Sequence, residues 1–510
     1  MLTPIHKEEG STPGEKALAK LAGASFFGLW SYASVHRFLQ KGTRAFAHEV
    51  ADLLVLFGRD VIIFSEKDIQ FPVTNDIKVT WPRWFRKSVV ASVDQLRGAE
   101  TYIRSGRGPL FLDAKCTQPF PFPLNAPDLR VHLVAICRNS SGPGQRYFAQ
   151  FEEKGVEFSS TGTLAFNAPF REQDMLANPF WIGDFDPSKT FVHVFDEESL
   201  HLLMTELDTG PDFIDYLLVR ERAIRSEQLT RFFGEEDFLA AYLTNEGEEG
   251  FGSFLEGTPT TVVEARKTFA IAEHMWREFS GSLDYALHRT TRLQAGTWKR
   301  LTDEFSQAVV TAVVGEAQDQ SLDIHERAVR ALAAENRVSR AMLGRLLTEI
   351  HSIAHSKAVT VRTTHSLSNP KRLYIFLLYP QLETHESYSE YRKERMAWMQ
   401  MYARCAQVKF TEYSEIAVLG VDTKESVGGS ETIMVVDAYP DMPQDLKAQT
   451  LALMKEKGIF TGKNAPVRPT PSFVQSRPAS TVQTHWSKSP GANEPCICGS
   501  GKKYKKCCRL

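Results

Sequence analysis

EVADLLVLFGRDVIIFSEK, residues 49–67, is the stretch that decides the fold. It contains two short apolar runs, 52–57 and 61–64, on either side of a turn at Gly58. Short apolar runs around a glycine turn are typical of a β-hairpin. The hairpin folds the chain back on itself, so the charged residues at its two ends are expected to lie side by side.

The length of the hairpin loop decides which of these charged residues meet. Side chains alternate between the faces of a strand. A two-residue loop therefore places Asp52 opposite Ser65, with Lys67 on the same face and Glu66 turned away. A three-residue loop instead brings Glu66 opposite Asp52. The sequence leaves both alternatives open.

Either register gathers carboxylates and an amine at one end of the hairpin. Glu49 and Asp52 are three residues apart, at the expected junction of a helix over 44–51 and the first strand. Two carboxylates can hold Mg²⁺ or Mn²⁺, which prefer oxygen ligands. Lys67 can orient an attacking water, as metal-assisted phosphodiester hydrolysis requires. The alternative is a half-buried hairpin whose end carries solvated charges.

The surrounding sequence predicts a mixed α/β chain. Apolar periodicity indicates helices, and short apolar runs indicate strands. The expected helices cover 15–40, 44–51, 82–105, 197–206, 211–232, 386–405 and 443–457, with a mainly helical region over 235–350. The expected strands cover 109–115, 130–137, 190–195, 372–379, 415–422 and 431–437, with an insertion or irregular β segment over 139–190.

Bulk composition bounds the class of protein. A chain of 510 residues with 42% hydrophobic residues is long enough for about three packed domains. Its net charge of −2 excludes a globally basic nucleic-acid binder. The single cysteines Cys116, Cys137 and Cys405 suit reduced thiols. With neither a signal peptide nor a long apolar run, we expect a cytoplasmic protein without a membrane span.

The C-terminus contains a dense cysteine cluster, CICGSGKKYKKCC at residues 496–508. Four thiolates, from Cys496, Cys498, Cys507 and Cys508, are what a closed tetrahedral zinc site needs. The preceding stretch, 462–494, is rich in proline, serine and threonine and reads as a flexible linker. The alternative is a reduced basic tail without metal.

This cluster resembles the SEC-C motif, the zinc knuckle found at the C-terminus of the bacterial preprotein-translocase ATPase. The resemblance covers about 15 of the 510 residues. It implies structural zinc and a protein partner that binds the tail, and it leaves the activity of the chain open.

The hairpin and its flanks resemble the PD-(D/E)xK restriction-endonuclease-like nucleases over about residues 15–137. The resemblance implies that Asp52 is the motif's aspartate, Lys67 its lysine and Glu49 the helical acidic residue of some branches. It also implies that Gln95 orients the lysine or the substrate. The acidic position before the lysine holds Ser65, unless Glu66 takes its place through a bulge.

Two functions follow as expectations. The first is a metal-dependent nuclease acting on DNA or RNA. The resemblance further implies a role in bacterial defence and a homodimer. The second is an inactive adaptor of the same fold, favoured by Ser65 and by the near-neutral charge. Segments such as FFGLWSYASVHR (26–37) also resemble bacterial proteins of uncertain role that often end in a SEC-C motif.

A basic group at the start of the expected helix 82–105 is a candidate nucleic-acid contact. It comprises Arg83, Arg86 and Lys87, beside Trp81 and Trp84. Basic residues interleaved with aromatic ones can bind phosphates and bases. The alternative is a solvated basic face with the tryptophans packed beneath it.

The predicted domains follow these changes in pattern. They are a nuclease-like domain with a β insertion at 1–232, a mainly helical region at 233–350, a small α/β domain at 351–461, the linker at 462–494 and the zinc knuckle at 495–510.

Overall fold

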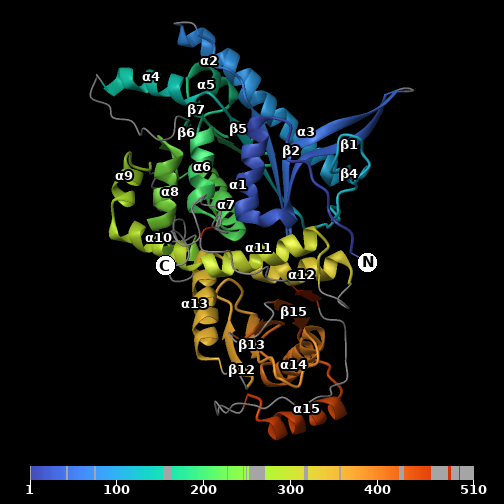
Figure 1. The fold of residues 1–510 in the computed structure, drawn as a ribbon. Coiled ribbons are helices and arrows are strands. Elements are labelled where there is room, and N and C mark those ends of the chain that lie inside the picture. Colours follow the sequence, from blue (N-terminus) through green and yellow to red (C-terminus); the bar gives the residue numbers. More distant parts are fainter. Residues whose placement is uncertain are drawn as a thin grey trace. The chain divides into compact units, whose positions relative to one another are not determined.

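The computed structural model divides the chain into two compact units, each built of helices and sheets (Figure 1). The N-terminal unit comprises Ile5–Ala295 and Asn336–Ala341, and the C-terminal unit comprises Met1–Pro4, Gly296–Glu335 and Met342–Leu510. The residues that the structure describes are 2–41, 44–73, 76–152, 164–226, 228–244, 246–247, 250–251, 270–314, 320–354, 358–423, 430–460, 480–483 and 493.

A six-stranded sheet in the order β4-β1-β2-β3-β5-β8 forms the centre of the N-terminal unit. Strands β1, β2 and β3 form an antiparallel meander, whereas β5 runs parallel to β3 and β8 parallel to β5. The strands of this unit are β1 (Ser31–Lys41), β2 (Arg44–Phe57), β3 (Asp60–Lys67), β4 (Leu110–Phe111), β5 (Arg130–Cys137), β6 (Ala165–Asn167), β7 (Trp181–Ile182), β8 (Val192–Phe195), β9 (Arg231–Phe232), β10 (Glu246–Gly247) and β11 (Gly250–Phe251).

Helices cover this sheet, with α1 packed on β1 and β2, and α3 on β3 and β5. Helix α2, the π-helical turn η1 and α3 follow one another without a break. The helices of this unit are α1 (Pro13–Trp30), α2 (Ile77–Phe85), η1 (Arg86–Val90), α3 (Ala91–Ser105), α4 (Ser141–Glu152), α5 (Glu172–Ala177), α6 (Glu197–Glu206), α7 (Gly210–Arg225), α8 (Glu235–Thr244), α9 (Met275–Ser280) and α10 (Leu283–Gln294).

The predicted hairpin is present as β2 and β3, and its loop has two residues. Phe57 pairs with Asp60, which leaves Gly58 and Arg59 as the turn. Gly58 has φ of 64°, a conformation that glycine adopts without the strain that a Cβ brings. Of the two registers that the sequence left open, the structure therefore has the one that turns Ser65, not Glu66, to the side of Asp52.

Two expected helices near the hairpin are wrong. The helix expected over 15–40 ends at Trp30, and the chain continues as β1. The helix expected over 44–51 is the first half of β2, so Glu49 lies on a strand and not at a helix end. In both cases the residues pair with a neighbouring strand, and this tertiary contact outweighs local helix propensity.

Other expected elements agree with the structure more closely. The expected strands at 130–137, 372–379, 415–422 and 431–437 are β5, β13, β14 and β15, and the expected helix at 197–206 is α6. The helix expected over 82–105 begins earlier, at Ile77, and the one expected over 211–232 ends at Arg225.

The C-terminal unit contains a five-stranded sheet in the order β12-β13-β14-β15-β16. Only β13 and β14 of the described strands in this sheet run parallel, and α14 connects them. The elements that follow α10 are α11 (Gly296–Val310), α12 (Leu322–Ala333), α13 (Arg337–Ile353), β12 (Thr360–His365), β13 (Arg372–Tyr379), α14 (Tyr388–Lys409), β14 (Glu415–Asp422), β15 (Glu431–Asp437), α15 (Gln444–Lys457) and β16 (Ser480–Gln483).

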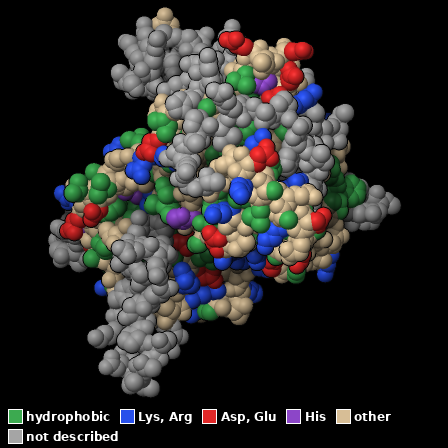
Figure 2. Space-filling view, turned by 90° about the horizontal axis from the view of Figure 1, so that it is seen from below, with side chains coloured by type: hydrophobic (Ala, Val, Ile, Leu, Met, Phe, Trp, Pro, Cys, Tyr) green, Lys and Arg blue, Asp and Glu red, His purple; other side chains and the backbone are tan. Residues whose placement is uncertain are grey.

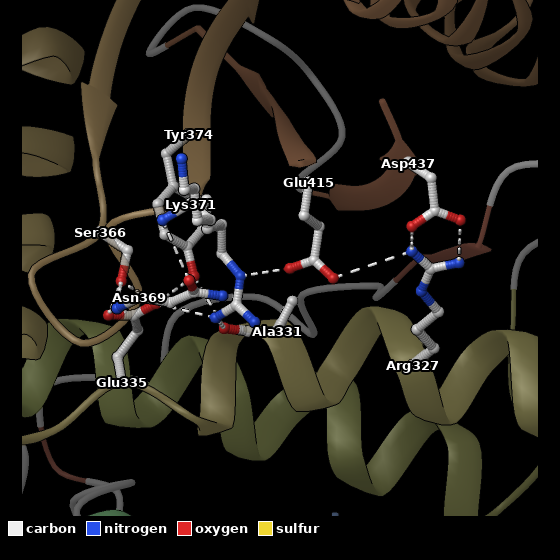
Figure 3. A network of polar contacts seen from close by, with 10 residues as sticks. Arg327, Ala331, Glu335, Ser366, Asn369, Lys371, Tyr374, Glu415 and Asp437 are labelled. Atoms are coloured by element: carbon white, nitrogen blue, oxygen red, sulfur yellow. Dashed lines mark hydrogen bonds and ion pairs between the residues drawn. The ribbon is translucent and has the colours of Figure 1, made fainter. Parts of the chain in front are cut away.

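A network of charged groups ties α12 and Glu335, two residues beyond its end, to this sheet (Figure 3). Arg372 of β13 donates to Glu335 at 3.0 Å and also binds Glu415 of β14. Tyr374 donates to the same Glu335 carboxylate at 2.9 Å. Arg327 of α12 binds Asp437 at the end of β15. Every charged group in this network has an opposite partner, so we assign the network to structure.

Among the described residues, no helix is both long and apolar enough to cross a membrane.

Candidate functional site

Three of the residues singled out in the sequence, Asp52, Ser65 and Lys67, meet around the side-chain amide of a fourth, Gln95 on α3. Its Nε2 donates to Oδ1 of Asp52 at 3.1 Å, while its Oε1 accepts from Nζ of Lys67 at 2.5 Å. The hydroxyl of Ser65 donates to the same Oε1 at 3.1 Å. Asp52 on β2 and the pair Ser65 and Lys67 on β3 therefore converge on one point of α3.

Glu66 reaches Asp52 through its backbone only. Its N–H donates to Oδ2 of Asp52 at 2.5 Å, whereas its side chain forms an ion pair with Arg138. The carboxylate of Glu66 lies so close to the first turn of α1 that a Cβ at Gly14 would stand 2.0 Å from its Oε1. Only glycine at position 14 permits this approach to the positive end of the helix.

Glu49 lies beside this cluster, next to an irregularity in the pairing of β1 and β2. Val35 pairs with Ala51 and His36 with Glu49, which leaves Val50 as an extra residue on β2. Nearby, Ser34 has φ of 49°. Such bulges and left-handed residues interrupt the regular alternation of a strand and are common beside active sites.

Burial and the negative charges of neighbouring carboxylates raise the pKa values of the acids in this cluster. Burial, together with the charges of Asp52 and Glu15, raises the pKa of Glu49 from its usual 4.5 to about 7. Burial also raises the pKa of Asp52, although the charge of Lys67 opposes this rise. Acids held with raised pKa values close to a lysine are candidates for a functional site.

Glu15, in the first turn of α1, is the member of this cluster that sequence analysis missed. Its charge raises the pKa of Glu49, of Asp52 and of Glu66, although burial is the largest cause for each of these three. Thr12 and Glu15 form a capping box. That motif predicts a helix start in the sequence, but only the folded chain shows that this helix begins beside the hairpin.

The donor set limits which metals the site can hold. Among the described residues, no group of three or more His, Cys, Asp or Glu side chains is placed to hold a metal ion. Two carboxylates, Glu49 and Asp52, lie near Lys67, and each oxygen of Asp52 already accepts one hydrogen bond. This set suits Mg²⁺ or Mn²⁺, which keep several water ligands, better than a metal that demands a full set of protein ligands.

The basic group on α2 and η1 has the second of its two expected arrangements, a solvated basic face above packed tryptophans. Trp81 and Trp84 are fully buried and stack on each other with ring centroids 5.5 Å apart. Arg83, Arg86 and Lys87 are exposed. The tryptophans thus pack beneath a solvated basic face and are not available to stack on bases.

Charge is mixed on the face of the molecule that Figure 2 presents. Lysine and arginine side chains lie interspersed with aspartate and glutamate there. This pattern agrees with the net charge of −2 and favours local rather than global attraction of a polyanion.

The four tail cysteines Cys496, Cys498, Cys507 and Cys508 lie outside the described residues. The family model of the SEC-C motif matches residues 493–510. The tail of this chain therefore carries a SEC-C motif, as the cysteine spacing suggested.

Curated relatives match a short part of the chain. A protein translocase subunit SecA from Treponema denticola is 43% identical over 51 residues, which are 10% of this chain and 6% of that protein. A SecA subunit from Elusimicrobium minutum is 54% identical over 39 residues, 8% of this chain and 4% of that protein. The chain thus spans only a small fraction of either relative. No solved structure matches it significantly.

Proposed function

We propose that the N-terminal unit is a metal-dependent nuclease that hydrolyses phosphodiester bonds. In this proposal Glu49 and Asp52 hold Mg²⁺ or Mn²⁺, and Lys67 orients the attacking water. The observation that carries the proposal is the convergence of Asp52 and Lys67 on the two ends of the Gln95 amide.

The topology of the unit supports the same proposal. A helix, an antiparallel three-stranded meander, a second helix and a strand parallel to the third follow in the order α1, β1, β2, β3, α3 and β5. This is the order expected of the restriction-endonuclease-like fold, with Asp52 on the second strand and Lys67 at the end of the third. We infer that the unit has this fold.

The side chains divide the work as follows. Gln95 fixes the position of Lys67, because its Oε1 accepts from the ammonium group while its Nε2 is held by Asp52. The ammonium group of Lys67 can then bind an attacking water or a phosphate oxygen. A divalent ion, when bound, would neutralise phosphate charge and lower the pKa of a water.

The test is cleavage of DNA and RNA, with Mg²⁺, with Mn²⁺ and with EDTA, by the wild-type chain and by Asp52→Ala. We expect cleavage that requires the ion and falls at least about 100-fold in the variant. Lys67→Met should lose activity while keeping its thermal stability. Equal activity of the wild type and Asp52→Ala would refute the proposal.

One observation favours the second candidate function, an inactive adaptor of the same fold. The acidic position holds Ser65, whose hydroxyl is bound to Gln95, and both oxygens of Asp52 already accept hydrogen bonds. Fewer lone pairs then remain for a metal. Binding of nucleic acid or protein without any metal-dependent cleavage would identify this function.

For the tail, we propose that Cys496, Cys498, Cys507 and Cys508 bind one structural zinc ion and that the knuckle docks onto a protein partner. Four thiolates match the tetrahedral preference of zinc. The proposed cytoplasmic location is consistent with these reduced ligands.

A further inference from the structure

Helix α10 of the N-terminal unit (Figure 1) is held to α6 by polar side chains. Tyr285 donates to Oε1 of the buried Glu206 on α6 at 3.0 Å, and Nε2 of His288 lies 3.1 Å from its Oε2. Arg292 donates to the same Oε2 at 3.0 Å. At about 100° per residue, these three side chains of α10 fall within about 60° of the helix circumference. One side of α10 therefore packs around a single carboxylate.

The opposite side of α10 is apolar and exposed. Leu283 is 75%, Leu287 57% and Leu293 79% exposed. Ala286 and Thr290 are exposed as well. All five fall within about 120° of the helix circumference, almost opposite the polar side. A helix of a globular protein normally turns its apolar side to the core, and an apolar surface left in solvent is typical of an interaction site.

We propose that α10 binds α10 of a second copy of the chain, with the two helices antiparallel, through this apolar stripe. The stripe comprises Leu283, Ala286, Leu287, Thr290 and Leu293. The contact is isologous, as in other two-fold dimers. Helix α10 lies outside residues 15–137, so the proposal rests neither on the resemblance to nucleases nor on the proposed activity.

The spacing of the stripe is self-complementary. Leu283, Ala286, Thr290 and Leu293 repeat at intervals of three, four and three residues, as the a and d positions of a coiled coil do. When two such helices run antiparallel, the a positions of one face the d positions of the other. Leu283 then packs on the partner's Leu293 in two outer layers, and Ala286 faces the partner's Thr290 in two inner layers.

The small residues of the inner layers allow the two helices to approach closely. The side chain of Ala286 ends at its Cβ. The hydroxyl of Thr290 donates to the backbone oxygen of Ala286 at 2.8 Å. This hydroxyl therefore needs no hydrogen-bond partner across the interface, and the pairing leaves no unsatisfied donor in its inner layers.

Charged residues border the stripe without entering it. Asp284 and Arg289 are exposed on α10 and lie outside the stripe, on its two opposite edges. Pairing of two stripes therefore buries neither charge. One acidic and one basic neighbour also leave the stripe without net charge, whereas an anionic membrane or a nucleic acid needs basic residues around it. An apolar protein surface is thus the partner that fits, and a second copy presents one of matching spacing.

The stripe is short, so the association is expected to be weak. Helix α10 has 12 residues, and its length is therefore about 18 Å. Two helices of this length cover less than the roughly 800 Å² per partner of a standard interface. We expect a dissociation constant on the order of 10–100 μM.

Sedimentation equilibrium of the full chain under reducing conditions measures this association, from about 1 to 200 μM so as to bracket the expected constant. Two double variants are compared with the wild type, Leu283→Lys/Leu293→Glu and Leu283→Lys/Leu293→Lys. Antiparallel pairing brings opposite charges together in both outer layers of the first variant and like charges together in the second. Parallel pairing would bring like charges together in both variants.

The two variants should therefore differ although both lose the same two leucines. Leu283→Lys/Leu293→Lys should be monomeric throughout. Leu283→Lys/Leu293→Glu should retain a dimer at least about tenfold tighter at low salt, and about 0.5 M NaCl should remove this difference by screening. The matched control is Leu451→Lys, which changes an exposed leucine on α15 and should leave the association unchanged.

Several results would overturn the inference. They are a wild-type chain that is monomeric at about 200 μM, well above the expected constant, equal association of the two double variants, or an equal loss of association in Leu451→Lys. Thermal unfolding of each variant is measured alongside. Lower melting temperatures with unchanged association would show that another part of the same chain covers the stripe. Binding of anionic vesicles by a monomeric wild type would assign the stripe to a membrane instead.

Discussion

At the scale of single residues, an amide and not an acid organises the candidate site. Gln95 donates to Asp52 and accepts from Lys67 at the same time. A carboxylate at position 95 could accept from the lysine, but it would repel Asp52. The resemblance to a nuclease family pointed to Gln95, whereas nothing in the sequence showed that Ser65 shares the same amide oxygen.

Glu49 is expected to make the stability of the N-terminal unit depend on pH. Its pKa of about 7 in the folded chain lies above its usual 4.5, so the folded state binds more protons between these values. The free energy of unfolding contributed by this group therefore falls as the pH rises from about 4.5 to 7. Glu49→Gln should stabilise the unit by about 1 kcal/mol at pH 8, after allowance for solvent screening, and by little at pH 4.

Urea unfolding of the wild type and Glu49→Gln at pH 4, 6 and 8 measures this difference. Glu412→Gln, at an exposed turn of the other unit, is the control. If Glu49 binds a divalent ion, Mg²⁺ should stabilise the wild type at pH 8 and leave Glu49→Gln unchanged. A stability difference between wild type and Glu49→Gln that does not vary with pH would contradict the assigned burial of this carboxyl.

Ser65→Asp is expected to turn the site into a better metal site. Ser65 is fully buried, and a carboxylate there would add a second negative charge beside Asp52, with the single ammonium group of Lys67 to offset both. Without metal the variant should lose about 3 kcal/mol of stability. Mg²⁺ or Mn²⁺ at about 100 times its dissociation constant should return about 2.7 kcal/mol, because it binds the folded state only.

Thermal unfolding with and without Mg²⁺ or Mn²⁺ measures both the loss of stability and its recovery. Ser65→Asn introduces a side chain of nearly the same shape as Ser65→Asp but without the negative charge, so comparing the two variants separates electrostatic from steric effects. Divalent ions should raise the melting temperature of Ser65→Asp more than that of Ser65→Asn. Equal shifts in the two variants would show that a carboxylate at position 65 does not join Asp52 in holding a metal, and no shift in either would argue against a metal at Asp52.

At the scale of secondary-structure elements, the loop of the β2–β3 hairpin sets the register of the site. Gly58, with φ of 64°, is the residue that its two-residue turn requires. Gly58→Ala should destabilise the N-terminal unit by about 1–2 kcal/mol, because a Cβ is strained in this conformation. Gly98→Ala, in the exposed middle of α3 with open space around it, should instead stabilise by up to about 1 kcal/mol. Urea unfolding of both variants checks the opposite signs.

The same elements show how far the sequence predicts this fold. The runs 52–57 and 61–64 are apolar enough to identify the hairpin on their own. The stretch 44–51 holds Ala45, Ala47 and Glu49, which favour helices locally, and yet it forms a strand because β1 pairs with it. The sequence therefore predicts which residues form the candidate site. It does not predict how they are arranged, because the first half of β2 is a strand despite its local preference for helix.

At the scale of the whole molecule, the candidate site draws on segments far apart in the chain. Glu15 comes from α1, Asp52 from β2, Lys67 from β3 and Gln95 from α3. Glu15 escaped prediction because no sequence pattern links a helix cap to a hairpin 37 residues further on. The C-terminal unit and the tail contribute none of the residues of this cluster, so recruitment and chemistry are expected to separate on mutation.

The tail gives the sharpest test of that separation. The double variant Cys507→Ser/Cys508→Ser should lose one zinc ion per chain, because two sulfur ligands cannot complete a tetrahedral site. Cys116→Ser, which changes a half-buried thiol in the N-terminal unit, should keep the zinc. Metal analysis after gel filtration measures the content. Strand β16 (Ser480–Gln483) lies inside the stretch that the sequence predicts as a linker and pairs with β15, so that stretch is not a free linker over its whole length. Because the four cysteines follow β16, thermal unfolding of the two units and cleavage by the chain should still be the same in the double variant. Unchanged zinc content in Cys507→Ser/Cys508→Ser would refute a four-sulfur site, and a lower melting temperature would show that the tail packs on a unit rather than serving as a separate docking module.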